Sequence, residues 1–526
     1  MRNYHGRKAA LLAVSGALAL VLSGCGGGDD GPGSGASANP SSTAGVKKGG
    51  SLTLLSVSDA QRFNPFHTTY AAVTDLNRML ALYDTLFYTD NANNKIVPNI
   101  GESLATADGG TTWTMKLKPN VKFSDGTGLD AEAVKKNWDM HANPETRSYH
   151  VSAAASLKSE VVDPLTLKIT PVAPNANLDR LIALELSYIA APASLADTTG
   201  EKPVGAGPFV LKEWTRGNQM VFEKNPNYWQ GPDKPALDRL VIKVVPDVAQ
   251  QLSTVKSNGA DVFFTIDPEK TANAKKEGLG ITPFTLDGGQ MVAFNSKVPP
   301  FDDPRARKAV ALALDPADLN ERVFSGTAVP AKSIFNSKDR FFDPSAVQPS
   351  TNRAAAQELF NQLAAEGKKV DFTYMVPENP ASNRTAEYTM TALNGYENVS
   401  VKLEKVDVKQ YTNKLQIGRN YQAALYQVWA SDVEPILYKF LHSKSPENFL
   451  HYANADVDKA LDTGRATADE AQRKAAYAAL QKAVVTDFPV VAYQEAVTVI
   501  VSGPKVSGIV GVQDGGMLMD RVGVSG

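Results

Sequence analysis

GAGPFVLKEWTRGNQMVFEKNPNYWQG, residues 205–231, is the stretch of sequence that decides the fold. Gly205, Gly207 and Pro208 interrupt any preceding element, because glycine tolerates positive φ and proline has no backbone donor. FVLKEW and QMVFEK predict two short strands, and the turn TRGN between them predicts a hairpin with Gly217 in the left-handed conformation. NPNYWQGP then closes the unit as an aromatic turn. Taken alone, the unit could be a surface hairpin of a β-rich domain.

The order of these residues resembles the signature region of the family 5 extracytoplasmic solute-binding proteins. These proteins are the oligopeptide-, dipeptide- and nickel-binding receptors of ABC importers. The resembling pattern is G-x-G-P-[FY], a strand ending in Trp, a turn, a second strand and N-P-x-Y-W. A second resembling phrase, FNSKVPPFDDPRARKA, lies at residues 294–309, and a third, FSDGT, at 123–127. The resemblance covers nearly all of residues 50–515, although Glu132 stands where relatives often have Asp.

The resemblance implies an α/β, two-lobe periplasmic-binding-protein-like fold (type II, or cluster C) with a hinge between the lobes. Lobe I would comprise residues 51–284, with an inserted subdomain at about 65–195, and the returning segment 488–526. Lobe II would comprise residues 285–487. In lobe II, strands alternate with helices, which predicts a parallel or mixed sheet with helices on both faces. The helices expected there and just before are 247–257, 352–366, 381–394 and 408–417, and one that opens with a capping box, Thr467 to Glu470. Asp303-Pro304 and Asp315-Pro316 each predict a further helix start, with Asp as the cap and Pro in the first turn.

Length and charge exclude several classes of protein. The 526 residues are too many for a single core, so two or three domains are expected. The net charge is -2, and removal of residues 1–24 leaves 51 basic and 56 acidic side chains, a net charge of -5. Such a chain has no electrostatic reason to bind nucleic acid. Its single cysteine excludes an intramolecular disulfide and a cysteine zinc site. As a separate expectation, the protein is a monomer.

The N-terminus predicts export and lipid anchoring. Residues 1–24 have a basic start and an apolar run, which is typical of a signal peptide. Leu-Ser-Gly-Cys at 22–25 resembles a bacterial lipobox, in which Cys25 is acylated; the alternative is a free cysteine after an ordinary signal peptide. Residues 25–50 contain almost no apolar side chain and predict a flexible tether. We therefore expect the protein on the outer face of the bacterial cytoplasmic membrane.

The sequence contains no pattern typical of an enzyme. G-x-S-x-G, H-E-x-x-H, the P-loop and G-x-G-x-x-G are all missing, and Pro208 would spoil a phosphate cradle after Gly207. No two of the six histidines pair at helical spacing, so no metal site is predicted, and we expect no cofactor. A catalytic triad assembled from distant residues stays open, since triads are spatial and not sequential.

The strongest binding candidate is the segment WASDVEP, residues 429–435. It resembles the family's W-x-x-D-Y-x-x-P segment, in which the Asp pairs with a peptide's α-ammonium and the Trp walls the pocket. The resemblance assigns these roles to Asp432 and Trp429; the alternative is that Asp432 caps the next helix. Val433 departs from the family pattern. Tyr426 lies where some relatives carry an Arg that meets a ligand carboxylate, so the Asp could instead bind another amine or a sugar hydroxyl.

Two further residues lie near ligand-contacting segments of relatives. Asp59 follows the first strand, and Gln290 opens lobe II. Each could equally be an ordinary turn residue. For Trp214, Tyr228 and Trp229 we expect packing within lobe I.

These observations predict a solute-binding receptor that closes on a peptide and delivers it to ABC permease subunits. Within the same class, a nickel chelate, an oligosaccharide or glutathione could be the solute. A tethered secreted hydrolase and a surface lipoprotein without transport function are the alternatives from other classes.

Overall fold

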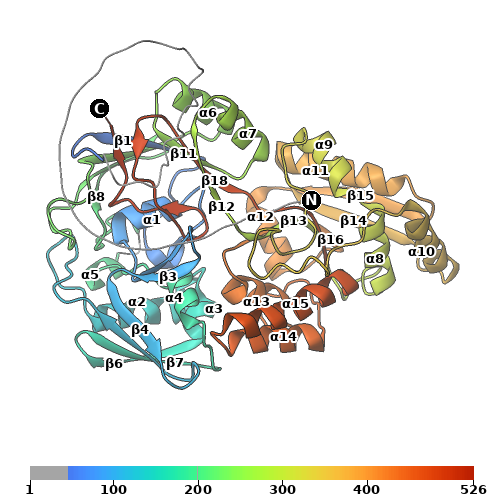
Figure 1. Ribbon diagram of the computed structural model, residues 1–526, viewed down its shortest axis with the longest axis horizontal. Helices are drawn as coiled ribbons and strands as arrows, with labels where there is room; N and C mark the ends of the chain where they lie inside the picture. The colour runs from blue at the N-terminus through green and yellow to red at the C-terminus, as the bar shows by residue number, and fades with distance from the viewer. Residues whose placement is uncertain (1–45, 198, 526) are drawn as a thin grey trace, which may run out of the picture. The chain divides into compact units, whose positions relative to one another are not determined.

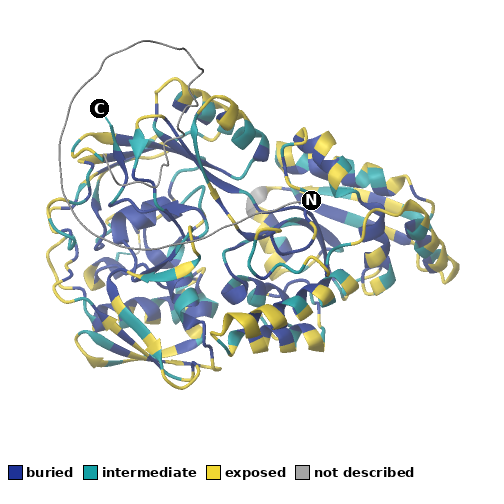
Figure 2. Cartoon of the chain, viewed as in Figure 1, coloured by how far each residue is buried: buried dark blue, intermediate teal, exposed yellow. Residues whose placement is uncertain are grey.

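The computed structural model describes residues 46–197 and 199–525, and three β-sheets organise them (Figure 1). The predicted signal peptide, Cys25 and the tether up to residue 45 lie outside the described residues. Figure 2 shows that buried residues follow the strands, whereas exposed residues gather on the outer helices. The alternation of strands and helices confirms the predicted α/β class.

The first sheet has seven strands and combines segments from both ends of the described chain. In spatial order they are β12 (Gly280–Phe284), β18 (Thr498–Ser502), β11 (Val262–Thr265), β1 (Ser51–Ser56), β10 (Arg239–Val244), β9 (Gln219–Lys224) and β8 (Phe209–Thr215). β1 is parallel to β10 and β11, and the other neighbours are antiparallel. β18 therefore lies between two strands that precede it by more than 200 residues.

The second sheet has five strands, all from the middle and late parts of the chain. They are β15 (Val399–Val406), β14 (Val370–Pro377), β16 (Ala423–Ala430), β13 (Asp287–Phe294) and β17 (Val490–Gln494). β14 is parallel to β15 and β16, while β13 is antiparallel to β16 and β17, so the sheet is mixed, as predicted.

Helices cover both faces of the five-stranded sheet because its strands are apolar on both sides. Along β13, Met291 and Ala293 enter one core, and Val292 and Phe294 enter the other. The helices of the second core are α8 (Pro304–Ala313), α9 (Pro316–Phe324), α10 (Arg353–Ala365) and α11 (Pro380–Asn394). Those of the first are α12 (Val408–Thr412), α13 (Tyr438–Leu441), α14 (Ala455–Arg465) and α15 (Glu470–Asp487).

A four-stranded antiparallel sheet forms the third layer, within the region 65–195. Its strands are β4 (Gly101–Thr106), β5 (Trp113–Leu117), β7 (Thr166–Pro171) and β6 (Leu157–Asp163). The helices in and after this part of the chain are α1 (Leu76–Tyr83), α2 (Ala131–Ala142), α3 (Val151–Ala155), α4 (Leu178–Glu185), α5 (Pro192–Leu195), α6 (Val248–Lys256) and α7 (Pro268–Lys276). Short strands complete the fold: β2 (Phe87–Asp90), β3 (Lys95–Pro98), β20 (Gly511–Val512) and β21 (Gly516–Met517) in one sheet, and β19 (Val506–Ser507) with β22 (Gly523–Val524) in another.

Most predicted helix starts are confirmed, and one is wrong. The side chains of Asp303 and Asp315 accept backbone hydrogen bonds at the starts of α8 and α9, each followed by a proline in the first turn. For α15, the cap is Asp469, which accepts from the Gln472 N–H, and not Thr467. Thr467 instead accepts from the N–H of Asp469. Asp469 directly precedes the first helical residue, so its carboxylate reaches the N–H groups of the first turn. Thr467 lies two residues earlier in the chain.

The stretch 205–231 forms the predicted hairpin, but its glycines act for a different reason. Gly217 has φ of 72°, as expected at the turn. Gly205 and Gly207 do not have positive φ; a Cβ on either would lie 2.2–2.4 Å from the end of α1. The Gly207 N–H donates to the Leu82 carbonyl at 2.9 Å. Glycine is therefore required at both positions because the backbone of α1 leaves no room for a Cβ atom.

The aromatic turn reaches the same end of α1. Tyr228 Oη and Trp229 Nε1 donate to the Asp84 carboxylate at 2.9 and 3.1 Å. Asp84 is buried and directly follows α1. Burial raises the pKa of Asp84 to about 7, and the bonds from both aromatics oppose this rise. Residues 205–231 thus connect the seven-stranded sheet to the end of α1, the helix that precedes the four-stranded sheet, through these hydrogen bonds.

We predict that Gly207→Ala lowers the free energy of unfolding by about 1–3 kcal/mol, because the new methyl group would lie 2.4 Å from the backbone of Ala81 and Leu82. Gly128→Ala is the matched control, since a Cβ there meets nothing within 4 Å; its effect should stay within about 0.5 kcal/mol. Urea denaturation of both variants measures the difference. Equal stabilities would show that the close approach does not constrain the fold.

Candidate ligand-binding site

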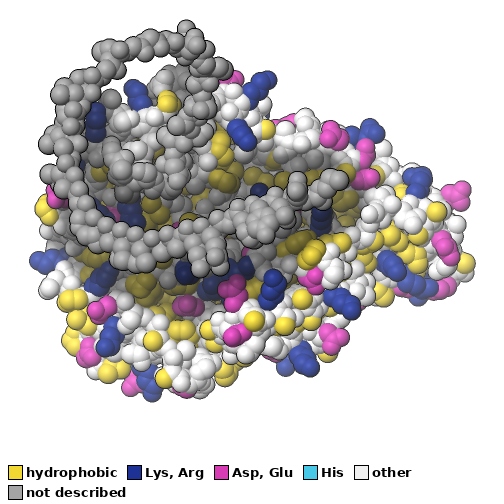
Figure 3. Space-filling view, in the orientation of Figure 1, with side chains coloured by type: hydrophobic (Ala, Val, Ile, Leu, Met, Phe, Trp, Pro, Cys, Tyr) yellow, Lys and Arg dark blue, Asp and Glu magenta, His cyan; other side chains and the backbone are white. Residues whose placement is uncertain are grey.

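A cavity of about 710 Å³ lies between the body of the seven-stranded sheet and that of the five-stranded sheet. Its volume falls within the range of small-molecule sites. The wall on the first side comprises Thr69–Val73, Tyr149, His150, Leu184, Glu185, Ile266, Thr498 and Asp514. The wall on the other side comprises Gln416, Ile417, Tyr426–Trp429, Ile436, Lys439, Phe440, Pro446, Glu447 and Phe449. Figure 3 shows one face of the molecule, on which acidic and basic side chains are interspersed.

Aromatic side chains form much of the apolar wall. The Tyr426 ring stacks on Phe440 at a centroid distance of 5.5 Å and meets Phe449 edge-on at 4.7 Å. Trp429, three residues on in β16, packs against the core of the seven-stranded sheet. Since residues three apart on a strand point to opposite faces, the two rings contact different cores. Both nevertheless line the cavity.

An ion pair crosses the cavity from one wall to the other. Lys439 Nζ in α13 lies 2.6 and 2.8 Å from the two carboxylate oxygens of Glu185 in α4. Burial alone would raise the pKa of Glu185, but the Lys439 ammonium outweighs it and holds the pKa at about 2. His150 Nδ1 is 3.5 Å from the same carboxylate, and Glu447 is 3.5 Å from the same ammonium.

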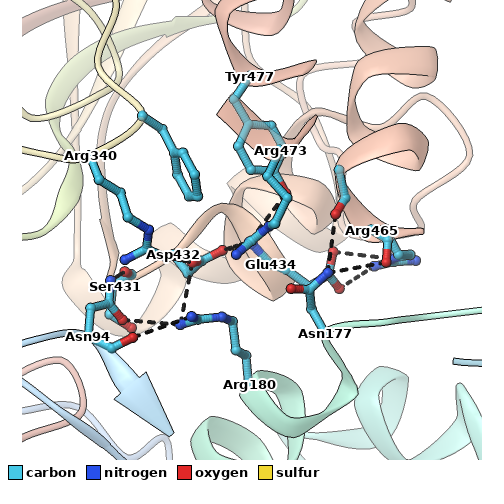
Figure 4. Close-up of polar contacts among 12 residues, drawn as sticks. Asn94, Asn177, Arg180, Arg340, Ser431, Asp432, Glu434, Arg465, Arg473 and Tyr477 are labelled. Atoms are coloured by element: carbon cyan, nitrogen blue, oxygen red, sulfur yellow. Dashed lines mark hydrogen bonds and ion pairs between the residues drawn. The ribbon is translucent and has the colours of Figure 1, made fainter. Parts of the chain in front are cut away.

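Asp432, directly after β16, lies in a cluster of arginines (Figure 4). Its side chain is 2% exposed. Arg473 of α15 donates to Oδ1, Arg340 donates to Oδ2, and Arg180 of α4 lies 3.4 Å from Oδ2. Burial alone would raise the pKa of Asp432, yet the three guanidinium groups outweigh it and hold the pKa below its ordinary value.

Further polar contacts join the same two bodies beside this cluster. The Asn177 amide donates to the carbonyl oxygens of Gly464, Arg465 and Thr467 at 3.0–3.2 Å. The Asn94 amide donates to the carbonyl oxygen of Ser431. Within the second body, Arg465 pairs with the buried Glu434 through two bonds, of 2.5 and 3.0 Å (Figure 4). These polar contacts therefore join the two bodies outside the cavity wall.

The predicted site residues fall into two groups. Tyr426 and Trp429 line the cavity. Asp432, Gln290 and Asp59 are outside its wall. The Asp432 carboxylate also accepts a hydrogen bond from the Glu434 N–H at 3.1 Å. This is the helix-capping contact that the sequence offered as the alternative to ligand binding.

The side chains of the other two have partners of their own. Gln290 Oε1 accepts from Tyr493 Oη at 3.0 Å. The carboxylate of Asp59 accepts from Trp214 Nε1 at 2.9 Å and from the Gly217 N–H at 2.8 Å. A ligand-binding role for Gln290, Asp59 and Asp432 stays a prediction.

Sequence reasoning missed the arginines, Glu185 and Lys439. A signal was present for some of them. Arg473 lies one turn before the apolar face of α15, and Lys439 interrupts the apolar run ILYKFL. A lone charge inside an apolar pattern indicates a buried ion pair. No such local pattern points to Arg340, which lies in a polar loop.

No group of His, Cys, Asp and Glu among residues 46–197 and 199–525 could hold a metal ion. In the same ranges, no helix is both long enough and apolar enough to cross a bilayer.

Residues 95–448 match the family described as bacterial extracellular solute-binding proteins, family 5 Middle. The chain belongs to this family. The predicted class of solute-binding protein is thereby confirmed, and the family is not one of enzymes.

Two relatives illustrate the range of the family. The oligopeptide-binding protein AppA of Bacillus subtilis (strain 168) is 26% identical over 516 residues, which cover 92% of each chain. The glutathione-binding protein GsiB of Pectobacterium atrosepticum is 26% identical over 443 residues, 80% of this chain and 84% of the relative.

Solved structures confirm the two-lobe fold. AppA of Bacillus subtilis in complex with a nonapeptide has a TM-score of 0.77 at 21% identity and covers 91% of this chain and 100% of AppA. AgaA of A. tumefacien R10 in complex with agropinic acid has a TM-score of 0.79 at 22% identity and covers 91% of this chain and 99% of AgaA. The two bodies that flank the cavity are therefore the two lobes of this fold.

We predict that Asp432→Asn lowers the free energy of unfolding by about 3–5 kcal/mol at pH 7, because it leaves the buried Arg473 and the partly buried Arg180 and Arg340 without their shared carboxylate. The folded-state pKa of Asp432 is below its ordinary value, so the stabilisation is present above about pH 4 and is lost as the pH falls further. Denaturant titrations at pH 7 and pH 3 measure both effects.

Asp371→Asn is the matched control for this substitution. Asp371 is exposed on β14 of the same sheet, so the loss of its charge should change stability by less than about 0.5 kcal/mol. A similar cost for the two substitutions would contradict the assigned role of Asp432.

Proposed function

We propose that the protein is an extracytoplasmic receptor of an ABC importer that binds peptides in the cavity between its lobes and delivers them to the permease. The observation that carries this proposal is the cavity itself, whose wall is supplied by both lobes. A solute held there contacts both lobes at once, so it binds the closed state more tightly than an open one and shifts the equilibrium toward closure.

Peptides are favoured over the other solutes by two facts. AppA, similar along 92% of this chain, is named an oligopeptide-binding protein, and its solved structure holds a nonapeptide. The aromatic wall around Tyr426 and the mixed polar groups opposite it suit side chains and amides of varied kind. Glutathione, a nickel chelate or an oligosaccharide is the alternative within the same class, and GsiB is named for the first of these.

The remaining parts of the chain complete this proposal. Residues 1–24 act as the signal peptide, Cys25 carries the lipid, and residues 25–50 tether a monomeric receptor to the outer face of the cytoplasmic membrane. Lobe I comprises residues 51–284 and 495–526, and lobe II comprises residues 285–494, because β17 belongs to the five-stranded sheet and the boundary falls after it and not at the expected residue 487. The chain passes between the two large sheets after β12 and after β17, and these two crossings serve as the hinge. The protein performs no chemistry on its solute.

The test of this function is to identify what the protein binds. Full-length protein purified without denaturant is analysed by native mass spectrometry, and the bound material is released and sequenced. Short peptides are the expected finding. A single sugar or metal chelate would leave the receptor class standing and overturn the peptide assignment. No bound material, with no thermal stabilisation by peptides, oligosaccharides or chelated nickel, would overturn the receptor function.

We predict that Trp429→Ala weakens binding of the identified solute by at least about 30-fold, as expected when a central aromatic anchor is removed. Phe342→Ala is the control, because Phe342 is also partly buried but lies outside the cavity wall. Isothermal titration calorimetry compares both with the wild type. Equal losses for the two variants would argue that Trp429 acts only through stability.

Closure has its own test, because Arg180 of lobe I reaches Asp432 of lobe II without lining the cavity. We predict that Arg180→Gln shifts the ligand-free equilibrium about fivefold toward open forms, equivalent to about 1 kcal/mol. Small-angle scattering should then give a larger radius of gyration. Arg322→Gln, which removes an exposed pair within α9, should leave it unchanged. An unchanged radius for Arg180→Gln as well would contradict the proposed closure contact.

A further inference from the structure

The cavity wall carries more acid than base. Among the described residues that line it, the carboxylates are Glu185, Glu447 and Asp514, whereas Lys439 is the only lysine or arginine. That lysine is already bonded twice to Glu185 and lies 3.5 Å from Glu447. The single ammonium is therefore shared between two carboxylates, and the third carboxylate has no cation beside it on the wall.

Asp514 lies in the turn between β20 and β21, which returns to lobe I near the C-terminus. One of its carboxylate oxygens, Oδ1, is buried and has no hydrogen-bond partner. Burial raises the pKa of Asp514 to about 6, although hydrogen bonding from Ser431 opposes the rise. The group is thus mostly ionised at neutral pH. A buried carboxylate without a cation is costly, and a positive charge from a ligand would remove that cost.

The turn that carries this carboxylate is held rigidly in place. Beside it, the Gln513 N–H donates to the Thr89 carbonyl at 2.8 Å, and Gln513 Oε1 accepts from Tyr188 Oη at 2.8 Å. On the other side, Gly515 has φ of 140°, and a Cβ there would lie 2.4 Å from Ala72. A charge fixed by such a turn is preorganised for a ligand, because binding requires no ordering of the loop.

Asp432, by contrast, has no free oxygen for a ligand's ammonium. Arg473 holds Oδ1, and both Arg340 and Arg180 reach Oδ2. A ligand cation would have to displace at least one of these three guanidinium groups. The position that the sequence pattern assigns to amine recognition is therefore occupied by side chains of the protein itself.

From these contacts we infer that Asp514 binds a cationic group of the solute, a primary ammonium or a guanidinium, while the apolar part of the solute lies against Tyr426, Phe449 and Trp429. The inference rests on the proposed function, since it requires a solute in this cavity. It makes the receptor selective for solutes with a positive charge. Because Lys439 is engaged by Glu185, a solute carboxylate finds no free basic partner on the described wall.

The test uses a matched pair of probes, the tripeptide amide Leu-Phe-Leu-NH₂ and its N-acetylated form, in which a small neutral acetamide replaces the ammonium. Calorimetry on the full-length wild type should give at least about 30-fold tighter binding of the free amine. Asp514→Asn should lose this preference and bind both peptides with the weaker affinity. Asp514→Glu, which keeps the charge, should restore part of the preference and controls for misfolding.

Asp371→Asn is the matched control, because Asp371 is an exposed acid on β14 that lies outside the cavity wall. Its preference for the amine should change by less than about threefold. A preference that survives in Asp514→Asn, or is equally lost in Asp371→Asn, would overturn the inference. So would a wild type that binds both peptides equally or neither. The proposed function is judged separately, from the solutes that co-purify with the protein.

Discussion

Burial of the Asp432 carboxylate is the constraint on which the interface between the lobes depends. An ionised carboxylate removed from water costs several kcal/mol unless charges and hydrogen bonds replace its hydration. Arg340 and Arg473 supply part of this replacement from lobe II, and Arg180 supplies the rest from lobe I. The lost hydration of the carboxylate is therefore fully replaced only when the two lobes are in contact. The burial of this one residue thus favours the arrangement in which the lobes touch.

The same physical logic separates the roles of the acidic residues near the cavity. Glu185 is buried but has Lys439 across the cavity, so its charge is neutralised by the protein. Asp432 is neutralised by arginines. Asp514 is partly buried, its buried Oδ1 has no hydrogen-bond partner, and its charge is the one that we propose to meet a ligand. Closure is thus stabilised by internal ion pairs, while solute selection is left to a different carboxylate.

The sequence predicted the fold further than it predicted the site. Strands, hairpin and helix caps depend on local rules of period, turn chemistry and side-chain hydrogen bonding, so stretches such as 205–231 and Asp303-Pro304 indicated their elements correctly. Tyr426 and Trp429 were found because the segment around them resembles the family's W-x-x-D segment. The partners of Asp432 come from three distant segments, and no spacing along the chain brings together Arg180, Arg340 and Arg473. The unpaired state of Asp514 likewise depends on what surrounds it in space.

The place of β18 in the seven-stranded sheet bears on how the protein is made. β18 lies between β12 and β11 and is hydrogen-bonded to both of them. A nascent chain that has been synthesised only as far as residue 497 therefore leaves both strands with unpaired edges, although about nineteen in twenty of its residues already exist. Exposed strand edges invite pairing with other chains. The sheet can be completed only after β18 (Thr498–Ser502) has been synthesised, so β11 and β12 depend on a partner strand that is made near the end of the chain.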